Sequence, residues 1–225
     1  MDYQPKRVTL FAGHYGSGKT NIALNFALWL KNLGKDVTVA DLDIVNPYFR
    51  SADSRDELNK LGIRLISSEY AGSNVDFPAL PGEMYAVTED KSNYAVMDIG
   101  GDDRGAYALG RYTEALLSEN HYEMIFVINK FRPLTKNASL TLEVLSEIET
   151  ACGMKFTGIV NNSNLGSLTS VEDIVDSFSY AIEVSELSGL PVLFTSVRED
   201  LFEEVAEKVG KEKLLPLKLQ SKIVD

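Results

Sequence analysis

The sequence predicts an α/β fold in which helices cover both faces of a doubly wound, mostly parallel sheet of about seven or eight strands. Two observations support this prediction. Short apolar segments alternate with helix-like segments along the whole chain, and a glycine-rich loop joins the first strand to the first helix. A length of 225 residues suits one domain, 1–225, and no internal repeat or low-complexity linker interrupts the pattern.

Apolar runs of strand length, bounded by turn residues, predict seven strands. They cover 7–12, 36–43, 63–68, 93–100, 122–129, 155–162 and 190–197. Helices are expected over 21–34, 51–61, 105–119, about 136–151, about 170–187 and 200–210. Residues 69–92 contain several prolines and glycines, and they read as a loop with at most one helical turn.

A phosphate-binding loop is predicted where GHYGSGKT matches the Walker A pattern G-x-x-x-x-G-K-[ST] in full. Its backbone N–H groups would surround phosphates, Lys19 would reach the β- and γ-phosphates, and Thr20 would bind Mg²⁺. The strand before it and the helix after it indicate a P-loop NTPase, whereas the alternative is a glycine-rich turn that binds nothing. The expected nucleotide contacts in this segment are Gly13, His14, Tyr15, Gly16, Ser17, Gly18, Lys19, Thr20 and Asn21.

Two strand ends carry acidic residues that would complete the site. MDIGGDD has the Walker B pattern, so Asp98 would hold Mg²⁺ through water, and Gly101 would let a backbone N–H approach the γ-phosphate. In DLDIVNP, Asp43 would orient the attacking water, and it joins Thr20 and Asp98 as a candidate magnesium ligand. The structural alternatives are a helix N-cap or loop aspartate for Asp98 and an Asx-turn for Asp43.

The loop, the DxD at the second strand end and the glycine-bearing Walker B together resemble the MinD/ParA/CobQ group of P-loop ATPases, of the SIMIBI class. The resemblance covers nearly the whole chain and includes the C-terminal pattern GLPVLFTSV-x-ED-x-F-x-EVA. It implies that two subunits enclose two ATP molecules face to face. It also implies that Asp43 positions water, that Asp41 is its partner, and that Asp98 binds Mg²⁺. The candidate catalytic residues are then Lys19, Asp41 and Asp43.

The chain departs from the group's loop at one position. The group has a signature lysine as the second loop residue, which crosses the dimer to the other subunit's phosphates, but here that residue is His14. A histidine is shorter than lysine and only partly charged near neutral pH. Protonated His14 or an arginine near a strand end (Arg50, Arg104 or Arg132) could replace that charge. The alternatives are that His14 and Tyr15 only make loop contacts and that each arginine makes a surface or structural salt bridge.

The base is expected to be adenine. A guanine-reading N-K-x-D motif is absent, and the most similar string, NKFR, has Arg132 in place of the aspartate. In the group this resembles, an asparagine at the end of the sixth strand binds the adenine edge, which implies that role for Asn161 or Asn162. Their alternative role is turn formation before the next two residues. Residues 196–200 would flank the base from the other side.

Composition narrows the class of partner. The net charge of −11 disfavours nucleic acid and anionic lipid, and the C-terminal tail is broken by Pro216, which disfavours a membrane-binding helix. A single cysteine, Cys152, excludes a disulfide framework or a C-x-x-C metal site within one chain. The start MDYQPKRV lacks an apolar signal segment, so we expect a cytoplasmic protein.

These features predict an Mg²⁺-dependent ATPase with low basal turnover that acts as a nucleotide switch, through a nucleotide-dependent homodimer, for a protein partner. Metalloenzyme maturation and positioning of an assembly are two such roles. One alternative is an ATP-dependent ligase or transferase of the CobQ or dethiobiotin-synthetase type. Another is a nucleotide-dependent interaction module with negligible turnover, which the absent lysine would explain.

Overall fold

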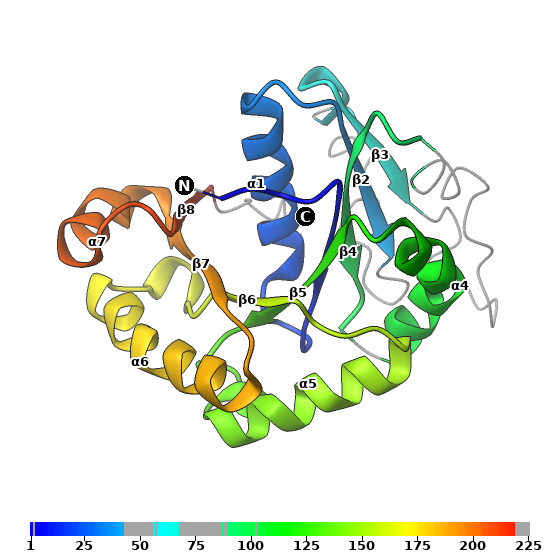
Figure 1. Cartoon of the computed structure of the whole chain (residues 1–225). Coiled ribbons are helices and arrows are strands. Elements are labelled where there is room, and N and C mark those ends of the chain that lie inside the picture. The colour runs from blue at the N-terminus through cyan, green and yellow to red at the C-terminus, as the bar shows by residue number, and fades with distance from the viewer. Residues whose placement is uncertain are drawn as a thin grey trace, which may run out of the picture.

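The computed structural model describes residues 1, 3–42, 56, 58–67, 87, 90–101 and 103–218, without the side chains of 103–108 and 111. Within these residues eight strands form one sheet, in the order β3-β2-β4-β1-β5-β6-β7-β8, and every pairing is parallel (Figure 1). The strands are β1 (Val8–Ala12), β2 (Val37–Leu42), β3 (Ile63–Ser67), β4 (Tyr94–Ile99), β5 (Tyr122–Ile128), β6 (Gly158–Asn161), β7 (Val192–Arg198) and β8 (Leu214–Leu217). The predicted fold class is therefore confirmed.

The helices begin and end at residues suited to those positions. Asn137 and Ser170 cap the N-termini of two of them, Ser170 in a capping box with Asp173, and the left-handed Gly153 and Gly189 end the same two helices. The helices are α1 (Lys19–Asn32), α4 (Asp103–Glu119), α5 (Ala138–Cys152), α6 (Val171–Ser188) and α7 (Phe202–Val209), with 3₁₀ turns η2 (Pro133–Thr135), η3 (Gly166–Leu168) and η4 (Glu199–Leu201).

The sheet is buried on both faces because helices cover each of them. Every residue of β1 and β2 is buried, as expected for strands in the middle of a parallel sheet. One face packs against α1, through Ile22, Phe26 and Leu30, and the other packs against α4, α5 and α6 (Figure 1). Residues of α7 and α6 form a third cluster that covers the β7–β8 end of the sheet.

The strand order places a ligand site beside β1. The chain pairs β1 with β4 on one side and with β5 on the other, so the order of the strands reverses there. Ligands bind at such a reversal, outside the carboxyl ends of the strands. The segment that leaves β1 at this point is the glycine-rich loop.

The eighth strand lies in the segment that we expected to be a tail, and it tolerates Pro216 because β8 is an edge strand, where one backbone N–H is not needed for pairing. Of the expected helix 51–61, the structure describes 56 and 58–61; 56 and 58–60 are helical, and 61 is in a turn. Most of the expected loop 69–92 lies outside the described residues, as do Asp43 and Arg50.

Candidate nucleotide-binding site

The loop between β1 and α1 has the shape of a phosphate cradle. Gly16 and Gly18 have positive φ angles of 75° and 90°, and the backbone N–H of Ser17 donates to the carbonyl oxygen of His14 at 3.1 Å. Such conformations favour glycine because other residues have a Cβ atom that clashes there. α1 begins at Lys19 without a side-chain cap and without an acidic residue in its first turn. Its N-terminal N–H groups and dipole therefore suit an anion.

The end of β4 lies directly against this loop. The Lys19 side chain is buried, and its Nζ donates to the carbonyl oxygen of His14 at 3.3 Å. A Cβ atom on Gly101 would lie 2.7 Å from the backbone nitrogen of Tyr15 and 2.8 Å from Lys19 Nζ. Only glycine fits at that distance, so the backbone after β4 is held against the lysine and the loop. The role of Gly101 beside the γ-phosphate stays a prediction.

The pair Thr20 and Asp98 suits a magnesium ion. Thr20 Oγ1 donates to Asp98 Oδ2 at 2.5 Å, and Asp98 is almost fully buried. A hydroxyl and a carboxylate are hard oxygen ligands, and P-loop proteins hold Mg²⁺ through these two groups and the phosphates. Asp41 is also buried and is the register partner of Asp98 across β2 and β4.

No group of three or more His, Cys, Asp and Glu side chains that could hold a metal occurs among the described residues. Mg²⁺ commonly binds through one or two carboxylates together with waters and substrate phosphates, so the Thr20–Asp98 pair still fits it. We expect the ion to bind together with the nucleotide and not to a site formed by side chains alone.

Asn162 holds the loop from the end of β6. Its Nδ2 donates to the carbonyl oxygen of Ser17 at 2.6 Å, and its Oδ1 accepts from Ser196 Oγ on β7. A Cβ atom on Gly18 would lie 2.2 Å from the same Nδ2 atom, so the amide packs directly on the loop. This supporting contact was not predicted, because nothing in the sequence pattern pairs a distant asparagine with a backbone carbonyl.

Asn161 points to a different part of the molecule. Its Nδ2 donates to Ser177 Oγ of α6 at 2.8 Å, and its Oδ1 accepts from the backbone N–H of Ser163. An amide has two N–H groups and two lone pairs on its oxygen, so each asparagine keeps one N–H beyond the bond to Ser177 or Ser17. The role of Asn161 or Asn162 in base recognition stays a prediction.

A small hollow lies beside the end of β6, next to the asparagine that contacts the loop. Arg198 closes it on one side, because its Nη1 donates to the carbonyl oxygens of Gly166 and Ser167 at 3.0 and 2.9 Å. Arg198 belongs to the segment 196–200 that was expected to flank the base. The lining residues are Asn162, Asn164, Gly166, Thr169, Ile174, Ser196, Arg198 and Leu217.

Among the candidate replacements for the signature lysine, Arg132 lies against the loop. Its Nε donates to the carbonyl oxygen of Gly16 at 2.7 Å. His14 is half-buried, with Nδ1 at 2.9 Å from the carbonyl oxygen of Tyr15. Arg50 and the side chain of Arg104 lie outside the described residues.

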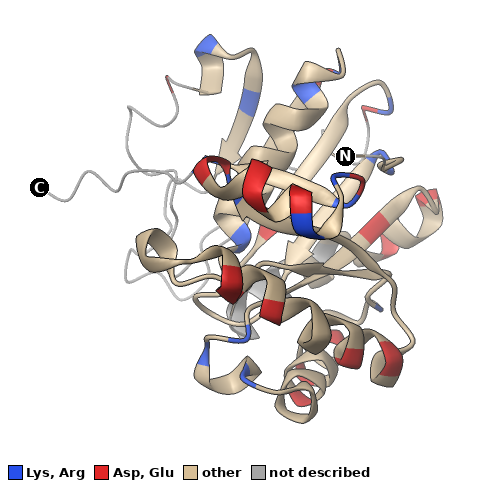
Figure 2. Ribbon diagram, turned by 90° about the vertical axis from the view of Figure 1, so that its left-hand side faces the viewer, with Lys and Arg blue, Asp and Glu red and all other residues tan. Residues whose placement is uncertain are grey.

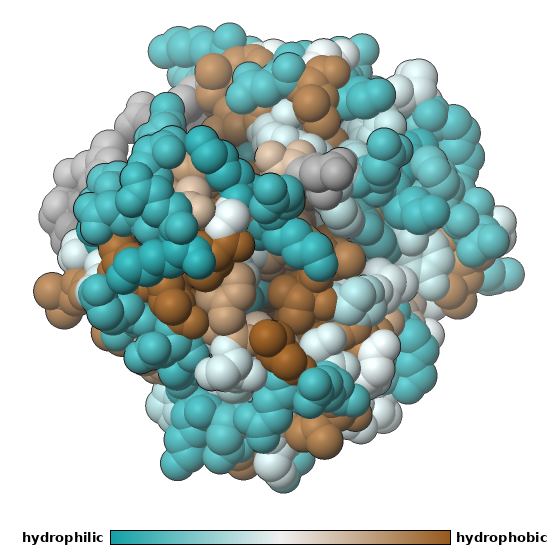
Figure 3. All heavy atoms as spheres, turned by 60° about the vertical axis from the view of Figure 1, so that its left-hand side comes forward, coloured by the Kyte–Doolittle hydropathy of each residue, from teal (hydrophilic) through white to brown (hydrophobic). Residues whose placement is uncertain are grey.

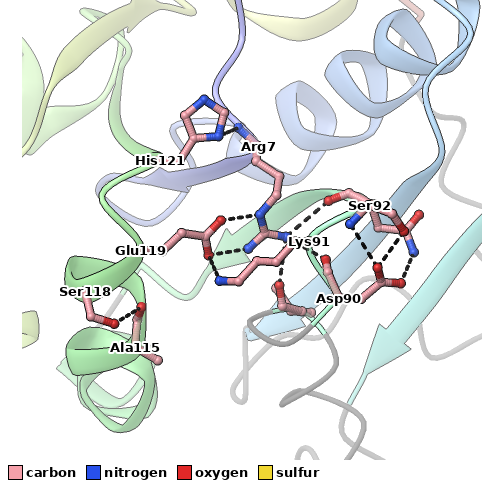
Figure 4. A network of polar contacts seen from close by, with 10 residues as sticks. Arg7, Asp90, Lys91, Ser92, Ala115, Ser118, Glu119 and His121 are labelled. Atoms are coloured by element: carbon pink, nitrogen blue, oxygen red, sulfur yellow. Dashed lines mark hydrogen bonds and ion pairs between the residues drawn. The ribbon is translucent and has the colours of Figure 1, made fainter.

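A second polar network lies at the opposite end of the sheet (Figure 4). Arg7, directly before β1, pairs with Glu119 at the end of α4, and Lys91 donates to the same carboxylate at 2.8 Å. The hydrogen bonds from Arg7 are the main reason that the pKa of Glu119 lies below its usual value. Arg7 Nη1 also donates to the carbonyl oxygens of Val87, Asp90 and Asn93. This network joins the start of β1 to the end of α4 and to the residues before β4, and it lies away from the loop.

The comparison with known families agrees with this geometry. The CbiA family, the CobQ/CobB/MinD/ParA nucleotide-binding domain, matches residues 8–215. The chain belongs to this family. The match extends from the first residue of β1 into β8 and therefore includes the loop, the β4 end and the β6 end. A nucleotide is consequently the ligand of this domain. No curated protein sequence matches the chain.

Several solved structures share the fold. FtsY from Thermotoga maritima has a TM-score of 0.58 at 17% identity over 98% of this chain and 67% of that one. Chloroplast FtsY from Physcomitrella patens has a TM-score of 0.60 at 17% identity, over 97% of this chain and 63% of that one. FtsY from Mycoplasma mycoides has a TM-score of 0.51 at 17% identity, over 87% of this chain and 62% of that one. The chain thus spans about two thirds of these proteins, and at this identity the similarity concerns the fold.

Within the described part of the chain, no helix combines the length and the apolar character needed to cross a membrane. Acidic residues are spaced along α6 and α7, the side that faces the viewer in Figure 2. They include Glu172, Asp173, Asp176, Glu183 and Glu186 of α6 and Glu203, Glu204 and Glu207 of α7. This side of the molecule is therefore unsuited to a polyanion.

Proposed function

We propose that the protein is a Mg²⁺-dependent ATPase with low basal turnover that acts as a nucleotide switch for a protein partner. The observation that carries the proposal is the contact of Gly101 with Lys19 and Tyr15. A backbone held against the phosphate lysine can move when the γ-phosphate leaves, which is how such proteins report the state of their nucleotide.

The chemistry would be in-line attack of water on the γ-phosphate. Asp43 would orient that water, with Asp41 beside it, while Lys19 and the loop N–H groups would stabilise charge on the transferred group. Mg²⁺, when bound, would neutralise charge on the β- and γ-phosphates through Thr20 and Asp98. The buried positions of Lys19 and Asp98 strengthen these interactions, because the local dielectric constant is low.

Adenine is the proposed base. One of the structurally similar proteins, FtsY from Elizabethkingia anophelis, is described in complex with GDP, so guanine has to be considered. In this chain Arg132 occupies the position of the guanine-reading aspartate, and its Nε is bound to Gly16. An arginine cannot accept hydrogen bonds from guanine as a carboxylate does. Asn161 and Asn162 each have one side-chain N–H left to donate to adenine. Asn161 Oδ1 has one lone pair left, whereas Asn162 Oδ1 already accepts from Ser196 Oγ and Asn164 Nδ2.

Exposed apolar side chains around the site support a nucleotide-dependent homodimer. Tyr15, Leu134, Leu165 and Leu168 are 63%, 49%, 42% and 81% exposed, and each follows the carboxyl end of β1, β5 or β6. These strands are neighbours in the sheet, so the four side chains lie around the same edge. Apolar residues gathered at one edge are typical of a surface that another molecule covers.

A second apolar surface supports binding of a protein partner. Figure 3 shows apolar side chains gathered among polar ones on the side of the molecule where α6 and α7 lie. Exposed apolar residues of α6 include Ile182 at 53% and Leu187 at 60%. If such a partner binds only one nucleotide state, it should be recovered from cell extract with ATP and lost with ADP.

Two variants test whether binding and turnover separate as proposed. Asp43→Ala should still bind Mg²⁺ and ATP but should lose hydrolysis, because Asp43 orients water and does not hold phosphate. Asp98→Ala should instead weaken Mg²⁺-dependent binding, because it removes the buried partner of Thr20. Calorimetry and phosphate release, with and without cell extract, measure the two effects. Hydrolysis by Asp43→Ala at the wild-type rate would contradict the proposed role.

The absence of the signature lysine favours one second candidate, a nucleotide-dependent interaction module with negligible turnover. The same phosphate-release measurement separates the two functions. Nucleotide binding with no phosphate released, either alone or with extract, would support the interaction module.

A further inference from the structure

We propose that Arg132 supplies the positive charge that acts on the terminal phosphate of the bound nucleotide. The inference rests on the proposed function, because it assigns to Arg132 of the same site the charge that the signature lysine supplies in the family and that is missing at His14. It starts from the hydrogen bond between Arg132 Nε and the carbonyl oxygen of Gly16, at 2.7 Å.

The backbone around Arg132 is fixed by the end of β5. The carbonyl oxygen of buried Asn129 accepts from the N–H of Arg132 at 3.1 Å and from Thr135 Oγ1 at 2.6 Å. Asn129 Oδ1 accepts from the N–H groups of Phe131 and Asn164, which ties this turn to the end of β6. Pro133 restricts the backbone of the residue before it, Arg132, to the extended conformation seen here. Arg132 is therefore presented to the loop from a rigid turn.

The guanidinium lies on the loop with donors left over. A Cβ atom on Gly16 would lie 3.5 Å from Arg132 Nε and 3.9 Å from its Cζ, so the group packs on the glycine itself. Gly16 is exposed, and Arg132 is half-buried. Arginine has five N–H groups, and one of them is used for Gly16. Among the described residues no carboxylate forms an ion pair with Arg132, and its Nη atoms make no hydrogen bond.

An arginine held in this way is better suited to binding a phosphate than to a purely structural role. Its planar group can bind two phosphate oxygens at once, and a single bond to a carbonyl leaves its charge uncompensated. The loop sequence itself offers Lys19 as a full cation, since the second loop residue is a histidine. Arg132 then provides a second permanent charge from outside the loop, which stabilises the extra negative charge of ATP relative to ADP.

Three substitutions separate charge from packing, with Lys136→Ala as the matched control. Lys136 is an exposed cation four residues along the same segment, and no described carboxylate pairs with it. Arg132→Ala removes charge and hydrogen bond, Arg132→Gln keeps a donor for Gly16 without charge, and Arg132→Lys keeps the charge. Calorimetry with Mg²⁺ and either ADP or the non-hydrolysable analogue AMP-PNP gives the affinity ratio of each protein.

The preference for AMP-PNP over ADP should fall by about tenfold or more in Arg132→Ala and Arg132→Gln, and it should largely survive in Arg132→Lys and Lys136→Ala. An unchanged ratio in Arg132→Gln, or an equal loss of affinity for both nucleotides, would overturn the inference and leave Arg132 as a support of the loop. Failure of the wild-type protein to bind either nucleotide would instead refute the proposed function. Thermal unfolding of each variant shows that it is folded.

Discussion

At Gly101 the site has no room for a side chain. The α-carbon of Gly101 lies so near Tyr15 and Lys19 that one added methyl group would touch both. In contrast, a Cβ atom on Gly110, in α4, would meet no described atom within 4 Å. The two glycines therefore form a natural pair for experiment, since the same substitution is crowded at one and free at the other.

We predict that Gly101→Ala lowers ATP affinity about tenfold or more, because overpacking of roughly 1–3 kcal/mol displaces the loop or the lysine. Gly110→Ala should keep wild-type affinity and stabilise the protein by about 0.5–1 kcal/mol, since alanine is favoured in a helix. Calorimetry and thermal unfolding measure both effects. Equal ATP affinity in Gly101→Ala and the wild type would show that the end of β4 does not act on the phosphate site.

Sequence patterns predict the parts of the site whose chemistry is local. The loop, Thr20 and Asp98 can be predicted because phosphate and Mg²⁺ require these residue types in the loop after one strand, at the start of its helix and at the end of another strand. The contacts of Asn162 with Ser17 and of Arg132 with Gly16 were not predicted in this form. Both end on backbone carbonyl oxygens, which every residue has, so no sequence pattern marks them.

At the scale of elements, β6 has a larger role than its length suggests. It is described over four residues, and its end supplies Asn161 and Asn162, which reach α6 and the loop respectively. The longer apolar segment 155–162 was predicted as the strand because its hydrophobic pattern continues beyond the paired residues. The paired strand begins three residues later than predicted, at Gly158, and ends at Asn161, which still pairs with Ile128 of β5 and Thr195 of β7.

The start of β1 and the end of α4 are joined by Arg7 and Glu119 (Figure 4). Hydrogen bonding by Arg7 lowers the pKa of Glu119 below its usual value of 4.5. The folded state therefore favours the charged carboxylate. Its contribution to stability is present above the pKa of the unfolded chain and is lost as the pH falls through the lower, folded pKa.

We predict that Glu119→Gln destabilises the protein at pH 7 by about 1–3 kcal/mol, because Arg7 loses its charged partner. As the pH falls below 4.5 and through the lower, folded pKa, the difference from the wild type should shrink, since the wild-type carboxyl also becomes protonated. Glu114→Gln, an exposed change on the same helix, should have little effect. Urea unfolding from pH 7 to pH 3 measures the difference, and a constant difference across that range would contradict the assignment.

For the whole molecule, the acidic charge and the exposed apolar edge act in opposite directions on assembly. A net charge of −11 on each chain opposes association, and two bound ATP molecules add further negative charge. The exposed apolar residues at the carboxyl ends of β1, β5 and β6, and permanent cations such as Arg132, would favour association. We therefore expect a dimer that forms with ATP and not with ADP.

Light scattering of the Asp43→Ala variant, which should not hydrolyse ATP, tests this expectation. Dimerisation should change little between about pH 6 and 8 if Arg132 supplies the charge, because arginine stays protonated there. If protonated His14 supplies it, the dimer should strengthen as the pH falls, and His14→Ala should abolish that dependence. A monomer at every pH with ATP would exclude the face-to-face dimer and favour a monomeric switch or a transferase.

The central claim is that the loop after β1 binds the phosphates of ATP through Lys19. Calorimetric titration of Mg²⁺–ATP into the wild type, Lys19→Ala and Lys31→Ala tests it most directly, since both lysines lie on α1 and only Lys19 is buried beside the loop. We predict that Lys19→Ala stays folded and loses ATP affinity by at least about tenfold, whereas Lys31→Ala binds as the wild type does. Undiminished ATP affinity in a folded Lys19→Ala variant would contradict the assignment of this site.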